Sequence, residues 1–517
     1  MITFAFASRF GRSPAFQLVS KALNISWSDY KSQANANNHQ SRRKFLTTVA
    51  TLAAAYAAPV LAKVQNEKPR IAVVGAGIAG LNAAYVLRQA GYHTTVYEAS
   101  QRTGGRILTS YGGIAPGLIT ELGGEFIDSI HLDMLALATA FGLPLLDTEI
   151  ENERNLRRMF FFNKRSYSEE QVITEFKPLA QRIARDAARI SLNITAKVHT
   201  EIDVEFDAIS VSEYLHRIGA TGWILDLINV AYTTEYGLDA SELSSINLLG
   251  LIDTRANDEF KVFGESDERF KIKGGNQRLT DELARRIGEN IQFGHRLASI
   301  RPNGKGFRLA FTTPGRTVSV EPDWVILALP FTLLRKVEIT DVLPPIKRNA
   351  IHHLGYGTNA KLVLGVAKRI WREQEYSGEC YSDEAFQTGW DSSRLQEGSA
   401  GAYTVFLGGK AGRELGVGTT DERARELSIA LDGVYPGFGV NRTDTSLRIH
   451  WPSEPFALGA YSCYRPGQWT QFNGEIGTRS GNLLFAGEHC STEFQGYMNG
   501  AAETGRVAAQ TVINASR

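Results

Sequence analysis

One short stretch near residue 75 has the residue types and spacing that hold a dinucleotide. Gly75, Gly77 and Gly80 form the pattern G-x-G-x-x-G directly after a β-branched run. The first glycine permits a tight turn, the second lets the backbone approach a pyrophosphate, and the third lets a helix pack closely on a strand. Glu98 lies about 20 residues further on, where a carboxylate accepts hydrogen bonds from ribose hydroxyls. These residues predict a binding site for the diphosphate and ribose of a dinucleotide.

The same stretch contains the elements that position these residues. The run 70–74 predicts a buried parallel strand, 78–89 a helix and 93–97 a second strand. Unpaired N–H groups at the start of that helix favour an anion such as a phosphate. A second glycine pair, Gly104 and Gly105, then precedes Arg106 and suits another approach to the same pyrophosphate.

Together these residues resemble the flavin-containing amine oxidase family, which includes monoamine oxidases, polyamine oxidases and L-amino acid oxidases. The resemblance rests on GAGIAGL at 75–81, the acid Glu98 and GGR at 104–106. It implies FAD as the cofactor. It also implies an α/β fold, in which a Rossmann-like FAD-binding domain of the GR2 type is interleaved with a mixed α+β substrate-binding domain.

The order of these patterns along the chain predicts the domain boundaries. Long helical patterns such as 169–197 occupy the middle of the chain, and no repeat or Gly/Pro linker interrupts them. We expect the FAD-binding domain to comprise 68–150, 265–335 and 446–517. The substrate-binding domain is expected to comprise 151–264 and 336–445.

Length, charge and cysteine content exclude several classes of protein. The 517 residues are enough for two domains, and the formal net charge of +1 gives no indication of a nucleic-acid partner. Cys380, Cys463 and Cys490 are too few and too scattered to predict a disulfide framework or a metal site. A homodimer is left open.

The first 62 residues resemble a targeting segment. Arg42 and Arg43 precede an alanine-rich apolar run that ends in Val60-Leu61-Ala62. This pattern predicts a twin-arginine signal peptide over 1–62 and export to the periplasm or beyond. Export of this kind carries proteins already folded around a cofactor. An uncleaved anchor that keeps the protein at the membrane is the alternative.

The resemblance places three further segments against the cofactor. Two of them are assigned to the flavin ring and its chain, and one to the adenine. The implied contacts are Gly124, Glu125 and Phe126 beside the isoalloxazine, Leu297 on an expected strand 291–300 beside the adenine, and Gly487, Glu488 and Met498 near the ribityl chain and the N1–C2=O locus. The alternative for Glu125 and Asp128 is that they are solvated acids of a loop. If either of them faces the cavity, a cationic substrate is favoured.

Three side chains are assigned to catalysis by the same resemblance. Lys361, in HHLGYGTNAKLVLGV, matches the lysine that holds a water against flavin N5 and promotes reaction with oxygen. Tyr461 and Tyr497 match the aromatic pair that flanks the substrate and aligns it. A solvated Lys361 and tyrosines that serve only in packing are the alternatives.

Two departures from the family pattern narrow the prediction. Ala460 stands where monoamine oxidases attach FAD through a cysteine, so we expect non-covalent FAD. Phe126 stands where venom-type L-amino acid oxidases carry an arginine that binds the substrate carboxylate. This favours amines without a carboxylate, unless Arg465 or Arg278 supplies the missing cation.

The expected activity is FAD-dependent oxidative deamination of a small primary amine, diamine or polyamine, by hydride transfer to flavin N5. The imine then hydrolyses, and oxygen or a membrane quinone reoxidises the flavin. An L-amino acid oxidase or dehydrogenase, for instance for basic amino acids, is the main alternative. A flavin-dependent isoprenoid desaturase or isomerase shares the dinucleotide motif but has no need of Lys361 or the two tyrosines. A purely structural FAD-binding module is the third alternative.

Overall fold

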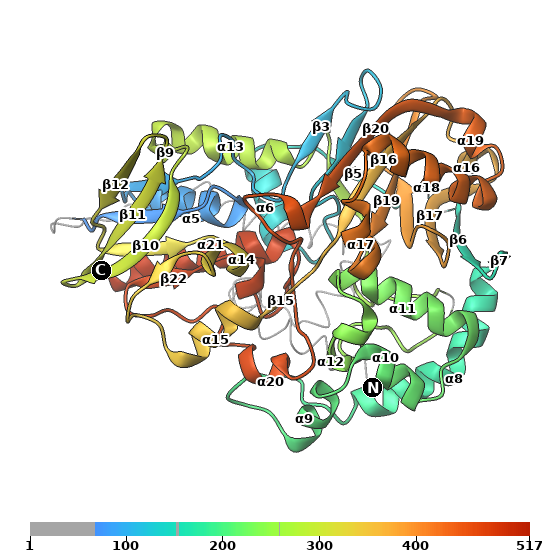
Figure 1. Cartoon of the computed structure of the whole chain (residues 1–517), viewed down its shortest axis with the longest axis horizontal. Coiled ribbons are helices and arrows are strands. Elements are labelled where there is room, and N and C mark those ends of the chain that lie inside the picture. The colour runs from blue at the N-terminus through green and yellow to red at the C-terminus, as the bar shows by residue number, and fades with distance from the viewer. Residues whose placement is uncertain (1–67, 151–152, 154, 258, 517) are drawn as a thin grey trace, which may run out of the picture.

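The computed structural model describes residues 68–516 except 151, 152, 154 and 258. The signal peptide expected over 1–62 lies outside this part. Two lobes are visible in Figure 1, one built on a parallel sheet and the other on a larger mixed sheet with helices below it. Within the described residues, no helix combines the length and the apolar character needed to cross a membrane.

A five-stranded parallel sheet forms the centre of the first lobe. Its strands come from distant parts of the chain, in the order β22 (Leu483–Phe485), β13 (Trp324–Leu327), β1 (Ile71–Val74), β2 (Thr94–Tyr97) and β9 (Ile291–Gln292). All four residues of β1 are buried, because the sheet is covered on both faces and its central strand consists of apolar, mostly β-branched residues. The Rossmann-like sheet predicted from the sequence is confirmed.

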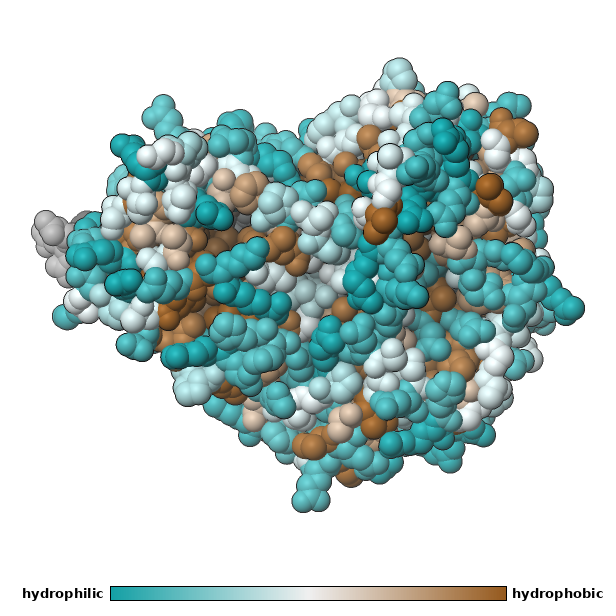
Figure 2. Space-filling model, viewed as in Figure 1, coloured by the Kyte–Doolittle hydropathy of each residue, from teal (hydrophilic) through white to brown (hydrophobic). Residues whose placement is uncertain are grey.

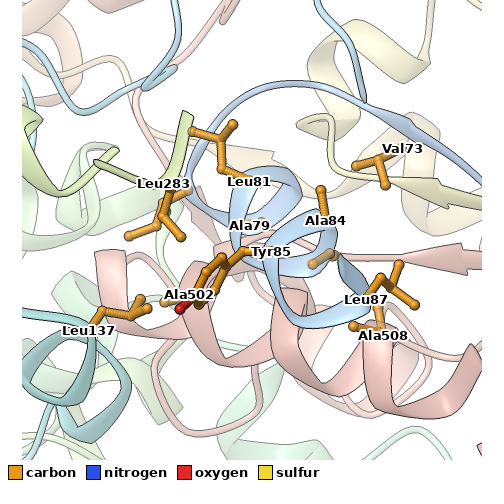
Figure 3. Close-up of a cluster of buried hydrophobic side chains, with 14 of the residues drawn as sticks. Val73, Ala79, Leu81, Ala84, Tyr85, Leu87, Leu137, Leu283, Ala502 and Ala508 are labelled. Atoms are coloured by element: carbon orange, nitrogen blue, oxygen red, sulfur yellow. The ribbon is translucent and has the colours of Figure 1, made fainter. Parts of the chain in front are cut away.

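Helices cover one face of this sheet. The helix after the glycine turn, α5 (Ile78–Gln89), packs against the C-terminal helix α21 (Met498–Ala515). A Cβ atom added at Gly505 would lie 2.1 Å from the carbonyl oxygen of Ala79, so the two helices approach as closely as a glycine permits. Figure 3 shows the core around α5, with Leu137 of α6 (Leu132–Ala140) and Leu283 of α13 (Gln277–Ile287) packed beside it.

The other face carries a four-stranded sheet. Its order is β12 (Arg316–Val320), β11 (Gly306–Thr313), β10 (Arg296–Asn303) and β14 (Glu338–Ile339). The prediction of a single strand over 291–300 is wrong. This segment contains β9 and the start of β10, which belong to different sheets and are separated by a turn at Gly294 with φ of 69°. A left-handed glycine conformation reverses the chain there, so one apolar pattern is divided between two strands.

The second lobe is built on a seven-stranded sheet. Its order is β20 (Arg442–His450), β16 (Ala360–Val366), β19 (Gly401–Leu407), β18 (Thr388–Asp391), β17 (Tyr376–Ser382), β6 (Arg157–Phe162) and β7 (Arg165–Tyr167). Neighbouring strands are antiparallel except β17 and β6, which are parallel. Strand β20 crosses the domain boundary expected at 446 and pairs with β16 as far as His450. Helices α17 (Gly409–Leu415), α18 (Thr420–Val434) and α19 (Phe438–Asn441) pack beside it.

A helical region lies below this sheet in Figure 1. It contains α8 (Glu169–Ala187), α9 (Glu201–Asp207), α10 (Val211–Arg217), α11 (Gly222–Tyr236) and α12 (Ser245–Leu249). The helix expected over 169–197 ends ten residues earlier, at Ala187. Beyond it, the N–H of Ser191 donates to Asp203 instead of continuing the helical ladder, and Thr200 caps the next helix.

Shorter elements complete the two lobes. They are β3 (Thr109–Tyr111), β4 (Ile119–Glu121), β5 (Leu145–Asp147), β8 (Phe270–Ile272), α14 (Phe331–Leu334), α15 (Pro345–His353), β15 (Gly355–Tyr356), α16 (Ile370–Glu373), β21 (Ser462–Cys463) and α20 (Gln468–Phe472). Hydrophilic residues cover most of the face shown in Figure 2, and groups of hydrophobic residues interrupt them. This mixture is ordinary for a protein exterior.

Candidate active site

A cavity of about 660 Å³ is lined by residues of both lobes. Its walls include the glycine turn before α5, the loops after β2 and β4, and the turn before α21. From the second lobe come the end of α11, strands β16, β17 and β18, and the loop before β8. The cavity therefore joins the expected cofactor segments to the expected substrate-binding domain.

The glycine turn leaves room for a ligand at one position only. Gly75 has φ of 105°, and an added Cβ would lie 2.6 Å from the carbonyl oxygen of Ala328. At Gly80 the added atom would lie 2.0 Å from the carbonyl oxygen of Gly75, whereas at Gly77 it would meet nothing within 4 Å. The start of α5 has no side-chain cap among the described residues. Open space in front of uncapped N–H groups fits a pyrophosphate.

The second glycine pair lies beside this turn. The N–H of Gly104 donates to the carbonyl of Ala76 at 2.9 Å, and Gly104 forms a parallel bridge with Gly77. Gly105 has φ of 58°, and an added Cβ there would lie 3.3 Å from the Cα of Gly77. Two glycine segments therefore line the same part of the cavity, as the sequence predicts.

Glu98 lines the cavity and also fixes the turn. Its carboxylate accepts hydrogen bonds from the N–H of Ala76 at 2.7 Å and of Ser100 at 2.8 Å. The end of β2 is thereby tied to the glycine turn. This second task is not visible in the sequence, because it depends on backbone donors and not on residue types.

Arg106 and Glu488 form an ion pair inside the cavity wall. Their Nη1 and Oε1 atoms are 3.0 Å apart, and Glu488 also accepts from Ser462 and from the N–H of Gly496. Burial opposes ionisation of Glu488, but attraction by Arg106 outweighs it and lowers the pKa of the carboxyl. Arg106 also donates to the carbonyl of Ala460. The pair therefore connects segments from three distant parts of the chain.

Glu125 is buried between two lysines. Its carboxylate lies 3.0 Å from the Nζ of Lys271 and 3.1 Å from the Nζ of Lys361. Burial alone would raise the pKa of Glu125, but the two ammonium groups lower it to about 2. Glu125, Asp128 and Lys361 all line the cavity and are buried, so none of them is a solvated surface group.

Lys361 has a complete set of acceptors. It donates to the carbonyls of Glu121 at 3.2 Å and Gly123 at 2.8 Å as well as to Glu125. An ammonium group has three donors, so a water bound by Lys361 would replace one of these contacts. Its role beside flavin N5 stays a prediction.

The remaining expected cofactor contacts differ in position. Gly124 and Phe126 line the cavity, and an added Cβ at Gly124 would lie 2.8 Å from the side chain of Met498, which also lines it. Gly487 lines it beside Glu488. Leu297, by contrast, is buried in the core with Phe311 and is not among the described residues that line the cavity. Core packing accounts for Leu297, and its contact with adenine stays a prediction.

The two expected aromatic residues are held by neighbouring residues of one helix. Both Tyr461 and Tyr497 line the cavity. The hydroxyl of Tyr461 donates to the carbonyl of Thr234 at 2.9 Å, and that of Tyr497 donates to the carboxylate of Glu235 at 2.7 Å. The last turn of α11 therefore positions both rings. Nothing in its sequence, TTEYG, indicates this role.

Several carboxyl groups face the substrate side of the cavity. They are Asp128, Glu235, Asp267, Glu268 and Glu379. Burial, followed by repulsion from Asp128, raises the pKa of Glu235 to about 7. Burial, followed by repulsion from Glu379 and Glu235, raises the pKa of Glu268. Such a group of acids disfavours a bound anion and stabilises a bound cation. Only Asp128 was expected from the sequence.

Comparison with known proteins shows the family. The model of the flavin-containing amine oxidoreductase family matches residues 78–513, and the chain belongs to this family. An amine oxidase of Danio rerio is 25% identical over 471 residues, which cover 86% of this chain and 85% of that protein. An L-amino acid dehydrogenase of Synechocystis is 24% identical over 461 residues, covering 85% and 94%.

The fold agrees with solved structures. A putrescine oxidase solved with bound putrescine superimposes with a TM-score of 0.74 at 20% identity, covering 87% of this chain and 99% of that chain. At this identity the likeness shows the fold alone. The α/β fold expected from the sequence is confirmed, and the protein is an FAD-dependent oxidoreductase of the amine oxidase family.

The described residues fit the cofactor of this family. The open space at Gly77, the uncapped start of α5 and the carboxylate of Glu98 suit the pyrophosphate and a ribose of FAD. The same cavity is also lined by Gly124 and Tyr497, beside which the ring would be held. No group of three or more metal-binding side chains occurs in the described part of the chain.

Proposed function

We propose that this enzyme oxidatively deaminates a small, positively charged amine, either a primary amine or a diamine or polyamine. Bound FAD supplies the chemistry, because its N5 atom accepts a hydride from the carbon next to nitrogen. The imine product then hydrolyses, and oxygen or a quinone reoxidises the cofactor. The group of carboxyls on the substrate side of the cavity is the observation that carries this proposal.

Two tyrosines support amine chemistry specifically. Tyr461 and Tyr497 are each fixed by a hydrogen bond to α11, so their rings have little freedom in the cavity. Aromatic faces held in this way align the nitrogen and the carbon–hydrogen bond of a small substrate. They also attract a cation before it loses its proton.

An L-amino acid oxidase or dehydrogenase remains the second candidate. The likeness to the Synechocystis L-amino acid dehydrogenase favours it. A substrate carboxylate would need a cation, but Arg278 and Arg465 are not among the described residues that line the cavity, and Arg465 pairs with Glu242 at 2.9 Å. Three further cations line this part of the cavity, and each is paired with an acid: Arg158 with Glu169 and Glu379, Arg394 with Glu153, and Lys261 with Glu259. These positions favour amines without a carboxylate.

A substrate panel separates the candidates. Putrescine, a monoamine, L-lysine and L-leucine are mixed separately with the holoenzyme without oxygen, and bleaching of the flavin absorbance is followed. We expect putrescine to bleach the flavin faster than either amino acid. Bleaching by the amino acids alone would favour the L-amino acid oxidase or dehydrogenase. If no amine and no amino acid bleached the flavin, both candidates would be wrong. The variant Tyr497→Ala should reduce the rate at least about 100-fold.

We propose further that FAD is held without a covalent bond. Ala460 lines the cavity at the attachment position and has no sulfur. Cys463 is fully buried among the helices of the second lobe and is not among the described lining residues. Acid precipitation should therefore leave all the flavin in the supernatant. Flavin that stays with the pellet after washing would contradict this.

We also propose export by the twin-arginine route, on the sequence of the first 62 residues. Replacing the arginine pair by Arg42→Lys and Arg43→Lys should leave the enzyme in the cytoplasm with its flavin bound. The unchanged protein should be found in the periplasmic or membrane fraction. Equal distribution of both proteins would contradict the proposal.

A further inference from the structure

Glu235 stands apart from the other acids of the cavity, because it touches one of the two tyrosines proposed to align the substrate. It is the next-to-last residue of α11, lines the cavity and accepts the hydroxyl hydrogen of Tyr497 at 2.7 Å. Resting on the proposed function, we propose that Glu235 is the base that removes a proton from the substrate ammonium group before oxidation.

Such a base is required by the chemistry of the substrate. Alkylamines resemble the lysine side chain, whose pKa is about 10.4, so they enter the cavity as ammonium ions near neutral pH. An ammonium nitrogen has no lone pair to stabilise the positive charge that develops when the neighbouring carbon is oxidised. The reactive form is the neutral amine, and the proton must pass to a group in the cavity.

The charged groups nearest the expected cofactor are unsuited to this task. The Lys361 side chain donates hydrogen bonds to three acceptors and offers no carboxylate to receive a proton. The pKa of Glu125 is about 2, because two lysines hold it ionised against the effect of burial. Glu488 is paired with Arg106, which lowers the pKa of its carboxyl. Carboxylates with low pKa values are poor bases.

Glu235 has the opposite environment. The charged groups that act on it from neighbouring segments are the acids Asp128 and Glu268, on two loops of the cavity wall. Tyr232, Tyr381, Tyr461 and Tyr497 are the titratable groups around it. Burial and Asp128 together raise the pKa of Glu235 to about 7, although the hydrogen bond from Tyr497 acts in the other direction. A pKa near the working pH is what a general base needs.

The proposed step conserves atoms and charge. One N–H bond of the ammonium group breaks and an O–H bond forms on the Glu235 carboxylate, so a cation and an anion become a neutral amine and a neutral acid. The hydrogen bond to Tyr497 holds the carboxylate beside the ring proposed to align the substrate. After the transfer, the protonated carboxyl can donate to the hydroxyl oxygen of Tyr497, so the contact persists in both states.

The test compares three holoenzymes over pH 5.5–9: wild type, Glu235→Gln and Tyr497→Phe. For the wild type, kcat/KM with putrescine should fall as the pH decreases through about 7, because protonated Glu235 accepts no proton. Glu235→Gln should lose about 100-fold of the rate at pH 7. Because only amine that is already neutral in solution then reacts, its kcat/KM should rise about ten-fold per pH unit over the whole range instead of levelling off above about pH 7. Tyr497→Phe should keep the decrease at a lower rate, since it removes the hydrogen bond but not the base. An unchanged pH profile in Glu235→Gln would overturn the proposal.

Two further measurements separate a base from a structural residue. A fluorinated amine that is mostly neutral at pH 7 should react with Glu235→Gln at close to the wild-type rate, and an equal loss for both amines would overturn the proposal. Binding of tetramethylammonium, followed by its effect on the flavin spectrum, should tighten above about pH 7 in the wild type and not in Glu235→Gln. This titration needs no turnover, so it gives a result even if no amine is oxidised and the proposed function fails. Glu235→Asp should restore the pH dependence, and flavin content verifies that each variant is folded.

Discussion

The Glu125 carboxylate has two lysine partners at almost equal distance, but only one of them faces the cavity. Lys361 lines the cavity, whereas Lys271 is buried and is not among the described lining residues. The two positions therefore distinguish what a lysine contributes to Glu125 from what it contributes to the reaction. They provide a matched pair of substitutions.

We predict that Lys361→Met and Lys271→Met lower stability similarly and differ in reactivity. Each leaves a buried carboxylate with one partner fewer, at a cost of about 3 kcal/mol. Only Lys361→Met should slow the reaction of the reduced flavin with oxygen, by roughly 10-fold to 100-fold, because it removes a cation from the cavity itself. Thermal unfolding and stopped-flow reoxidation measure the two effects. Equal slowing by Lys271→Met would show that Lys361 acts only through Glu125.

At the motifs, the sequence identifies side chains that line the cavity, and their roles in catalysis stay predictions. Tyr461, Tyr497 and Lys361 were expected from local patterns, and all three line the cavity. Glu235 and Glu268 were not expected, because their positions depend on how a helix end and a loop of the second lobe pack against the first. Such partners are distant in the sequence and have no spacing rule that reveals them.

At the scale of elements, the turn between β1 and α5 assigns different tasks to similar glycines. Gly80 is packed against the backbone of Gly75, while Gly77 faces open space and has an ordinary φ of −73°. A methyl group added at Gly80 would therefore contact the protein backbone, and one added at Gly77 would occupy the space expected for the cofactor.

We predict that Gly80→Ala destabilises the flavin-free protein by about 1–3 kcal/mol through overpacking. Gly77→Ala should leave the flavin-free protein as stable as the wild type and weaken FAD binding roughly ten-fold or more, since the methyl group occupies the space of the pyrophosphate. Thermal unfolding without flavin and titration with FAD measure these quantities. Unchanged FAD affinity in Gly77→Ala would contradict the assignment of this space.

The contact between α5 and α21 allows a second comparison. Gly505 touches the backbone of Ala79, whereas Val507, two residues further on, is 42% exposed. Gly505→Leu should separate the helices, lower stability by about 3 kcal/mol and reduce the flavin content of the purified protein. Val507→Lys should change stability by no more than about 0.5 kcal/mol. Loss of flavin in both variants would show that the helix tolerates no change on either face.

Element boundaries show where sequence reasoning fails. The start of α5 at Ile78 is expected from the glycine motif before it, and the structure has it there. The end of α8 and the division between β9 and β10 were misplaced, because a side-chain contact to Asp203 and a glycine turn override the apolar pattern. The domain boundary expected at 446 falls inside β20, which pairs with β16 as far as His450. Strand pairing, and not composition, decides where this sheet ends.

At the scale of the whole molecule, several buried carboxyls make stability depend on pH. Burial raises the pKa of Glu121, Glu235 and Glu503 to about 7 in each case. In the unfolded chain these groups ionise near pH 4.3. The contribution of these three carboxyls to the free energy of unfolding is therefore fully present below about pH 4.3. It is lost progressively as the pH rises towards 7.

Glu503 allows this effect to be measured away from the proposed chemistry. It lies in α21, is 8% exposed and accepts a hydrogen bond from Ser491, which a glutamine can also accept. We predict that Glu503→Gln stabilises the protein by up to about 3 kcal/mol at pH 8 and by nothing at pH 4.5. Denaturant unfolding at both pH values measures the difference. The exposed Glu170→Gln serves as control, and an equal gain at both pH values would contradict the assignment to ionisation.

The packing of Gly505 on Ala79 also limits how early in synthesis this part of the fold can form. Ribosomes add roughly 5–20 residues per second, so several tens of seconds pass between the synthesis of these two neighbours. Until β22 and α21 have emerged, the parallel sheet lacks its edge strand beside β13, and the helix after the first glycine turn lacks its covering helix. Nascent chains arrested before residue 480 should therefore capture no flavin. We therefore expect the cofactor to bind after synthesis, although the glycine turn expected to contact it is among the first parts of the domain to be made.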